Sequence, residues 1–193
     1  MPPPDLPHRL VKAGDDFTVW GATHHLRSRV HRAEVNRQTI SVVGYVVRTN
    51  YDKAPACAVH RIGRGDKPGC RAFVPSFTIA DEKGETGPAI DVMGWASSFA
   101  QLFTLIEAID KAPKGEEPRI ELKDEFWGGA LPNPVPNVGA KVKVTGTYAV
   151  TFTKGSGGAA ANPKYGILTT DRIDLLEPPP KAAVLPGMKL KKR

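Results

Sequence analysis

The chain has 193 residues and a formal net charge of +7 at pH 7. This length suits one domain, and 18 prolines with 19 glycines favour short strands and many turns over a helical bundle. No run of about 18 apolar residues exists, which excludes a transmembrane helix.

The charge is unevenly distributed. Residues 1–71 hold 12 Lys and Arg against 6 Asp and Glu, residues 72–140 hold 5 against 11, and residues 141–193 hold 10 against 3. Basic ends are typical of proteins that bind polyanions such as nucleic acid or acidic lipid. A basic and an acidic region can equally pair between copies and drive self-assembly. A third interpretation is an ordinary solvated surface with charged tails.

The first elements are short. Residues 1–14 are predicted to be a Pro-rich linker, because proline disfavours regular structure. Phe17–Ala22 is predicted to be a strand. The following basic stretch, His24–Arg32, allows one amphipathic helical turn, since Leu26 and Val30 are four residues apart.

Three strands are predicted in the middle of the chain. Thr39–Arg48 is rich in β-branched residues, with Gly44 where the strand can bend. Phe73–Ala80 alternates apolar and polar residues, although Pro75 restricts it to an edge or a bulge. After a turn, Ile90–Trp95 is the next strand.

A helix follows, capped by Ser97 or Ser98 and ending near Lys111. Its apolar residues recur at helical spacing and are expected to pack on the core; they are Phe99, Leu102, Phe103, Ile106 and Ile109. Residues 141–150 and 165–176 are predicted to be the last two strands. The folded domain is therefore expected over residues 15–177, and residues 178–193 form a Pro-rich basic tail.

Cys57 and Cys70 are the two cysteines, and both lie in a turn-rich loop. A disulfide between them would close this loop and stabilise the fold by about 3 kcal/mol, which would imply an exported protein. Zinc is an alternative, because His60 supplies a third ligand, and two unrelated thiols are another. The opening residues carry no signal peptide, yet they suit a linker left after a signal has been removed.

The order of strands, with one helix between the third and fourth, resembles the OB-fold domains of anticodon-binding and single-strand-binding proteins. The resemblance covers residues 38–177. It is carried by Ile40, Val42, Gly44 and Val46, by Phe77, Ile79, Asp81, Ile90 and Val92, and by Val142, Val144 and Gly146. It implies an all-β fold with one helix: a five-stranded OB-type β-barrel with an extra N-terminal strand and irregular arms.

A second resemblance rests on the cysteine loop followed by Phe77–Asp81 and Met93–Ser97. These segments are similar to uncharacterised exported lipoproteins of myxobacteria. That similarity implies a periplasmic or extracellular protein, lipid-anchored after processing of a signal. A nucleic-acid-binding protein would instead be expected in the cytoplasm.

The OB-fold resemblance implies a ligand across the second and third strands, flanked by the loops after the first and fourth. Strand alternation predicts that Asp91, Met93 and Trp95 point outward there, which provides one stacking ring and one negative charge. The candidate binding residues on this face and its loops are Tyr51, Lys53, His60, Arg61, Arg64, Lys67, Arg71, Trp95, Lys154 and Lys164.

No catalytic motif surrounds any of the 5 histidines, and no cofactor, metal or catalytic residue is predicted. The sequence favours a non-catalytic OB-fold binding or structural module, exported, that contacts other proteins or copies of itself through loops and tails. The alternative is a single-stranded nucleic-acid-binding protein, supported by the positive charge and the fold resemblance.

We expect Cys57 and Cys70 to be bonded, because they share one loop and no third cysteine exists. Mass spectrometry without reductant then gives an intact mass two hydrogens below that of the reduced protein. Alkylation of both thiols in unreduced, exported protein would contradict the expectation.

Overall fold

A computed structural model describes residues 9–54, 74–84, 87–113, 116, 123–124, 129–150 and 164–190. Its strands form one mixed seven-stranded sheet in the order β1-β2-β3-β4-β5-β7-β6. Their bounds are β1 Lys12–Ala13, β2 Asp16–Thr18, β3 Thr39–Thr49, β4 Phe77–Ala80, β5 Ala89–Met93, β6 Lys141–Ala149 and β7 Ile167–Glu177.

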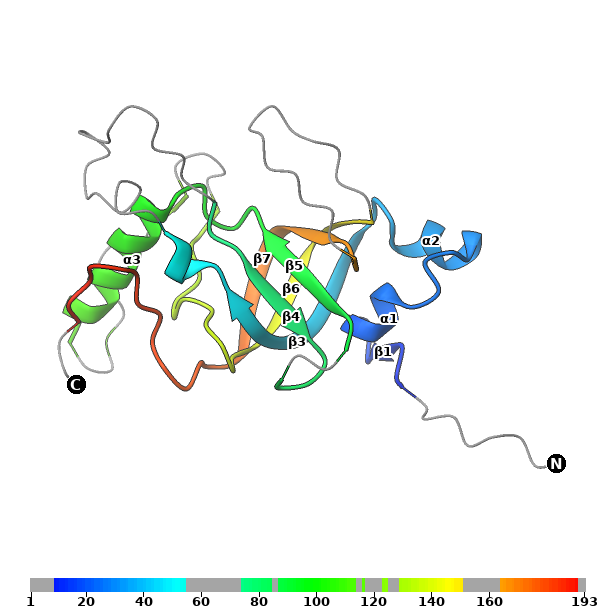
Figure 1. Ribbon diagram of the computed structural model, residues 1–193, viewed down its shortest axis with the longest axis horizontal. Coiled ribbons are helices and arrows are strands. Elements are labelled where there is room, and N and C mark those ends of the chain that lie inside the picture. Colours follow the sequence, from blue (N-terminus) through cyan, green and yellow to red (C-terminus); the bar gives the residue numbers. More distant parts are fainter. Residues whose placement is uncertain are drawn as a thin grey trace.

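Because β6 also pairs with β3, five of these strands form a closed ring of hydrogen-bonded neighbours (Figure 1). The ring runs from β3 through β4, β5, β7 and β6, and its β5–β7 pairing is parallel whereas the others are antiparallel. The predicted largely β architecture is therefore confirmed.

The long strand β3 holds this ring together. It pairs with β6 along residues 39–45 and with β4 from Tyr45 onward, so Tyr45 faces Lys141 on one edge and Ala80 on the other. A Cβ on Gly44 would lie 2.9 Å from the Ala80 carbonyl oxygen. Glycine at this position therefore lets the two strands approach closely.

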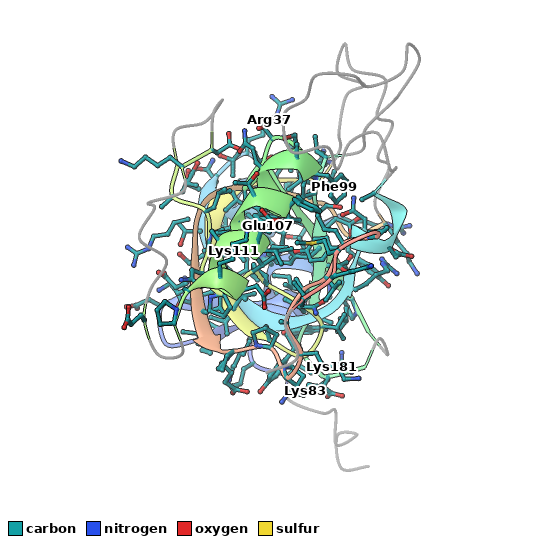
Figure 2. All side chains as sticks on the ribbon, turned by 90° about the vertical axis from the view of Figure 1, so that its left-hand side faces the viewer. Arg37, Lys83, Phe99, Glu107, Lys111 and Lys181 are labelled. Carbon is teal, nitrogen blue, oxygen red and sulfur yellow. The ribbon has the colours of Figure 1, made fainter. Side chains whose placement is uncertain are left out.

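The predicted helix is present as α3, Phe99–Lys111. The Ser98 hydroxyl accepts a hydrogen bond from the Gln101 N–H at 3.4 Å and caps its start. Its inward side chains are fully or almost fully buried at one end of the curled sheet (Figures 1 and 2); they are Phe99, Leu102, Leu105 and Ile106. Glu107 and Lys111 form an ion pair with 3.1 Å between Nζ and Oε2.

The predicted strand Phe17–Ala22 is largely wrong, and so is the expectation of a single helix. Strand β2 stops at Thr18, and helix α1, Val19–Thr23, begins immediately afterwards. The Thr18 hydroxyl accepts from the Gly21 N–H at 2.8 Å, which favours a helix start over further extended chain. A second short helix, α2, covers Arg29–Val35 and begins after Ser28.

Two predicted strand ends also shift. The strand expected over Phe73–Ala80 is reduced to β4, because residues 74–76 are not in a strand and proline weakens the ladder there. Strand β5 ends at Met93 rather than continuing to Trp95. The last two strands, β6 and β7, agree with the prediction to within two residues.

The segment after β7 packs against the domain, which the prediction of a separate tail did not anticipate. Ala183 and Leu185 are buried. The Asn137 amide donates to the Lys181 carbonyl oxygen at 3.1 Å and holds the segment in place. Among the described helices, none has the length and apolar character needed to cross a bilayer.

Leu102→Ala should lower the free energy of unfolding by about 2–5 kcal/mol, because it leaves a cavity in the core. Urea denaturation measures this change. Leu176→Ala, at a half-exposed position of β7, is the matched control and should cost less than about 0.5 kcal/mol. Equal effects would place α3 outside the core.

A candidate binding surface of arginines and stacked rings

The outer side of β4 and β5, the expected ligand face, is internally paired. Thr78 lies opposite Asp91 in the ladder, and its hydroxyl donates to the Asp91 carboxylate at 2.7 Å. The Arg48 guanidinium lies 4.0 Å from the same carboxylate oxygen. The Thr78 hydroxyl proton is therefore committed to Asp91, and the negative charge of this carboxylate lies beside a cation of the chain itself.

Trp95 does not lie on this face, and the prediction that it points outward is wrong. Its side chain is only 5% exposed and packs near Phe77, with ring centroids 5.9 Å apart. The reason is Gly94, whose φ of +83° redirects the chain where β5 ends. Strand alternation therefore does not extend to Trp95.

Tyr51 is also removed from the surface. It lies in a short 3-10 helix, Tyr51–Lys53, and is 3% exposed. Its hydroxyl donates to the Pro136 carbonyl oxygen at 2.7 Å, and burial raises the pKa of this phenol well above its usual value. Tyr51 is thus a neutral core residue rather than a stacking platform.

Of the other predicted binding residues, Lys164 is exposed, with its ammonium 5.1 Å from the centroid of the Tyr165 ring. For Lys53 the structure describes the backbone but not the side chain. The other predicted residues and the cysteine pair lie outside the described residues: Cys57, His60, Arg61, Arg64, Lys67, Cys70, Arg71 and Lys154.

The Tyr45 ring, on the outer side of β3, has lysine side chains of the same molecule beside it. The ammonium groups of Lys83 and Lys141 lie 4.9 and 5.3 Å from its ring centroid. The Glu177 carboxylate lies 3.7 Å from the Lys83 ammonium and 3.9 Å from the Lys141 ammonium. This ring is therefore already engaged in cation–π contacts.

A different surface carries positive charge without internal partners. Helix α2 and its flanking turns present four exposed arginines, which we call the arginine face: Arg27, Arg29, Arg32 and Arg37. In the described part of the chain, none of their side chains forms an ion pair. The nearby Glu34 carboxylate lies 3.7 Å from the His31 ring nitrogen Nδ1 instead.

Stacked rings adjoin the arginine face. Trp20 and His24 are four residues apart, at the spacing that brings helix side chains together, and their ring centroids are 4.2 Å apart with 13° between the planes. The His31 ring lies 4.4 Å from that of His24. The His24 Nδ1 is 2.8 Å from the Gly21 carbonyl oxygen, which fixes the ring on α1.

This ring cluster does not form a metal centre. His24, His25 and His31 do come together, with His25 5.0 Å from His24 between ring centroids. Nevertheless, no group of three or more His, Cys, Asp or Glu side chains in the described ranges is placed to hold a metal ion.

Asp81 anchors the helical unit to the sheet. One carboxylate oxygen accepts from the Val19 N–H at 2.7 Å and the other from the Trp20 N–H at 2.8 Å. A carboxylate at a helix start satisfies N–H groups that have no partner within the helix. Because Asp81 directly follows β4, this contact sets where α1 and the rings lie relative to the sheet.

Figure 2 shows Arg37 and Lys181 on opposite sides of the molecule, so the arginine face lies away from the C-terminal segment. The sequence signal for this surface was the basic stretch His24–Arg32. The helical turn that this stretch allowed overlaps the start of α2, which continues to Val35.

No family model matches the chain, and no curated protein matches it. Among solved structures, it is similar to a putative aspartyl-tRNA synthetase from Leishmania major Friedlin, with a TM-score of 0.41 and 10% sequence identity. The similarity covers 94% of this chain and 24% of that chain. A likeness at this level carries no argument about function, and these comparisons do not support the similarity to lipoproteins.

Asp81→Ala should lower the free energy of unfolding by about 1.5–3 kcal/mol, because two N–H groups of α1 lose their charged acceptor. Urea denaturation again provides the measurement. The exposed neighbour Glu82 is the control, and its replacement by Ala should change stability by less than about 0.5 kcal/mol. Equal losses would mean that the carboxylate does not anchor α1.

Proposed function

We propose that the chain is a non-catalytic binding module of the OB type, whose partner is a phosphate-bearing polyanion held by the arginine face. Support for the fold comes from the ring order β3-β4-β5-β7-β6, the parallel β5–β7 pairing and the position of α3 between β5 and β6. This arrangement matches a five-stranded Greek-key barrel with one intervening helix.

The carrying observation is the set of exposed arginines over residues 27–37, which have no carboxylate partner among the residues that the structure describes. A guanidinium offers a planar fork of donors that matches a phosphate group, and its charge is permanent. Arg29 and Arg32 are three residues apart on α2, so they are neighbours on its surface. Together they present adjacent charges to a chain of phosphates.

Single-stranded nucleic acid is the polyanion that this surface suits best. Sequence-tolerant binding of single strands combines cations that follow the backbone with planar rings. The half-buried rings of Trp20, His24 and His31 provide such groups beside the arginines. The rings lie on α1 and α2 rather than on the face of β4 and β5.

Self-association through the acidic middle of the chain has less support. Several of its described carboxylates are engaged within the molecule: Asp81 with α1, Asp91 with Thr78, and Glu107 with Lys111. Asp124 is 2% exposed and accepts from the Ser97 N–H at 2.7 Å. These contacts within the molecule compete with pairing to the basic ends of another copy.

Export stays a separate proposal, which rests on a disulfide between Cys57 and Cys70. Binding to a polyanion through the arginine face requires neither the disulfide nor a particular compartment. The cysteine test and the binding test can therefore succeed or fail independently.

A single-stranded oligodeoxythymidylate tests the proposal by fluorescence anisotropy over a range of salt. If all four arginines contact phosphates, the logarithm of the binding constant should fall with that of the salt concentration with a slope of about −2.8. Combined Arg29→Ala and Arg32→Ala changes should bring the slope to about −1.4, because two contacts are lost.

The matched control removes the same amount of charge elsewhere. It combines Lys181→Ala and Lys189→Ala, two exposed positions of the C-terminal segment. This variant should keep the wild-type slope. Equal weakening by both double variants would show that only net charge matters, and the arginine face would then be rejected as the site.

A further inference from the structure

The structure contains a cavity of about 350 Å³ whose described lining includes none of the arginine-face residues. It opens where β5 ends, between β7 and the chain that precedes β6. An isolated bridge between Lys123 and Ala130 forms part of its surroundings. Its lining residues include Trp95, Asp124, Pro132, Thr170, Arg172 and Ile173.

Two polar atoms at this cavity lack partners. Among the described residues, the buried side-chain nitrogen and oxygen atoms without a hydrogen bond are Trp95 Nε1 and Thr170 Oγ1. They come from segments that are distant in the sequence, yet both residues line the same cavity. A buried donor without an acceptor is costly, so such groups in folded proteins usually have a partner.

The size of the cavity indicates what kind of partner fits. A water molecule takes up about 30 Å³ in the liquid, so this space is about ten times larger than one water requires. Ligand pockets begin at about 300 Å³. The cavity therefore has the volume for a small organic molecule.

The charges around the cavity disfavour an anion. Asp124 and Asp171 both line it, whereas Arg172, the cationic residue among its described lining, is paired with Asp174 outside the lining. The guanidinium nitrogens Nη2 and Nε lie 2.7 and 2.8 Å from the Asp174 carboxylate. The carboxylates accept hydrogen bonds, the indole N–H donates, and the threonine hydroxyl does both. Such a lining suits a ligand with hydroxyl groups, because a hydroxyl can donate and accept.

We propose that this cavity binds a neutral, hydroxyl-bearing molecule of monosaccharide size. One ligand hydroxyl accepts a hydrogen bond from the Trp95 indole N–H, and another forms a hydrogen bond with the Thr170 hydroxyl. Both polar atoms are buried in the structure. Binding therefore includes a small rotation of these two side chains toward the ligand. The site is independent of the arginine face and of polyanion binding.

Saturation-transfer NMR and calorimetric titration with D-glucose, D-galactose and myo-inositol test this proposal on the full chain. At least one should bind saturably at millimolar concentration, and glucose 6-phosphate should bind more weakly than glucose. Trp95→Phe and Thr170→Val should each raise the Kd about tenfold, which corresponds to one hydrogen bond. Thr170→Val keeps side-chain size, whereas Trp95→Phe is smaller but keeps an aromatic ring in the core, so circular dichroism should show both variants folded.

Trp20→Phe and Thr147→Val are the matched controls, because neither residue lines the cavity. Their Kd values should equal that of the wild type. Three results would overturn the proposal: no binding of any of the neutral probes, tighter binding of the phosphorylated sugar, or an unchanged Kd in both cavity variants. In the first case, unchanged or raised thermal stability of Thr170→Val would identify the cavity as merely unfilled.

Discussion

Everything in this sheet depends on β3 forming hydrogen bonds along both of its edges. One edge holds β6 over residues 39–45, and the other holds β4 beyond that point and β2 at residues 42–43. A strand that changes partners midway has to twist strongly, and a bulge between Val46 and Arg48 contributes to this. Without both sets of bonds the ring would be an open sheet with two unpaired edges.

Two glycines make this closure sterically possible. A Cβ on Gly146 would lie 2.0 Å from the Thr169 carbonyl oxygen, and one on Gly44 would meet the Ala80 carbonyl oxygen at 2.9 Å. At both sites a neighbouring strand occupies the space of a side chain. The patterns around them, Val42-x-Gly44 and Val144-x-Gly146, therefore carry information about packing between strands as well as about propensity.

The sequence predicted best where periodicity continues over a whole element. The β-branched run of β3 and the apolar stripe of α3 each determine their own structure locally. The stretch after Thr18 is different. Its β-branched and aromatic residues favour a strand, yet the Asp81 carboxylate, more than 60 residues away, provides acceptors for the first turn of a helix. Local patterns do not contain such a contact.

The candidate sites were harder to predict for a related reason. An aromatic residue at a strand end can lie on either side, and a single left-handed glycine decided the side for Trp95. The arginines were evident as a basic stretch, but the lack of carboxylate partners for them in the described part of the chain depends on where the acidic side chains lie in the fold. The cavity beside Trp95 depends on three segments that no spacing rule connects.

The buried C-terminal segment has a consequence for how the protein is made. Leu185 is among the most deeply buried of the described residues, and a Cβ on Gly139 would lie 2.9 Å from Pro180 Cδ where this segment returns to the sheet. During synthesis the chain emerges from its N-terminal end. The residues after β7 therefore emerge later than the strands they pack against, and until then the apolar surface beneath Leu185 is uncovered.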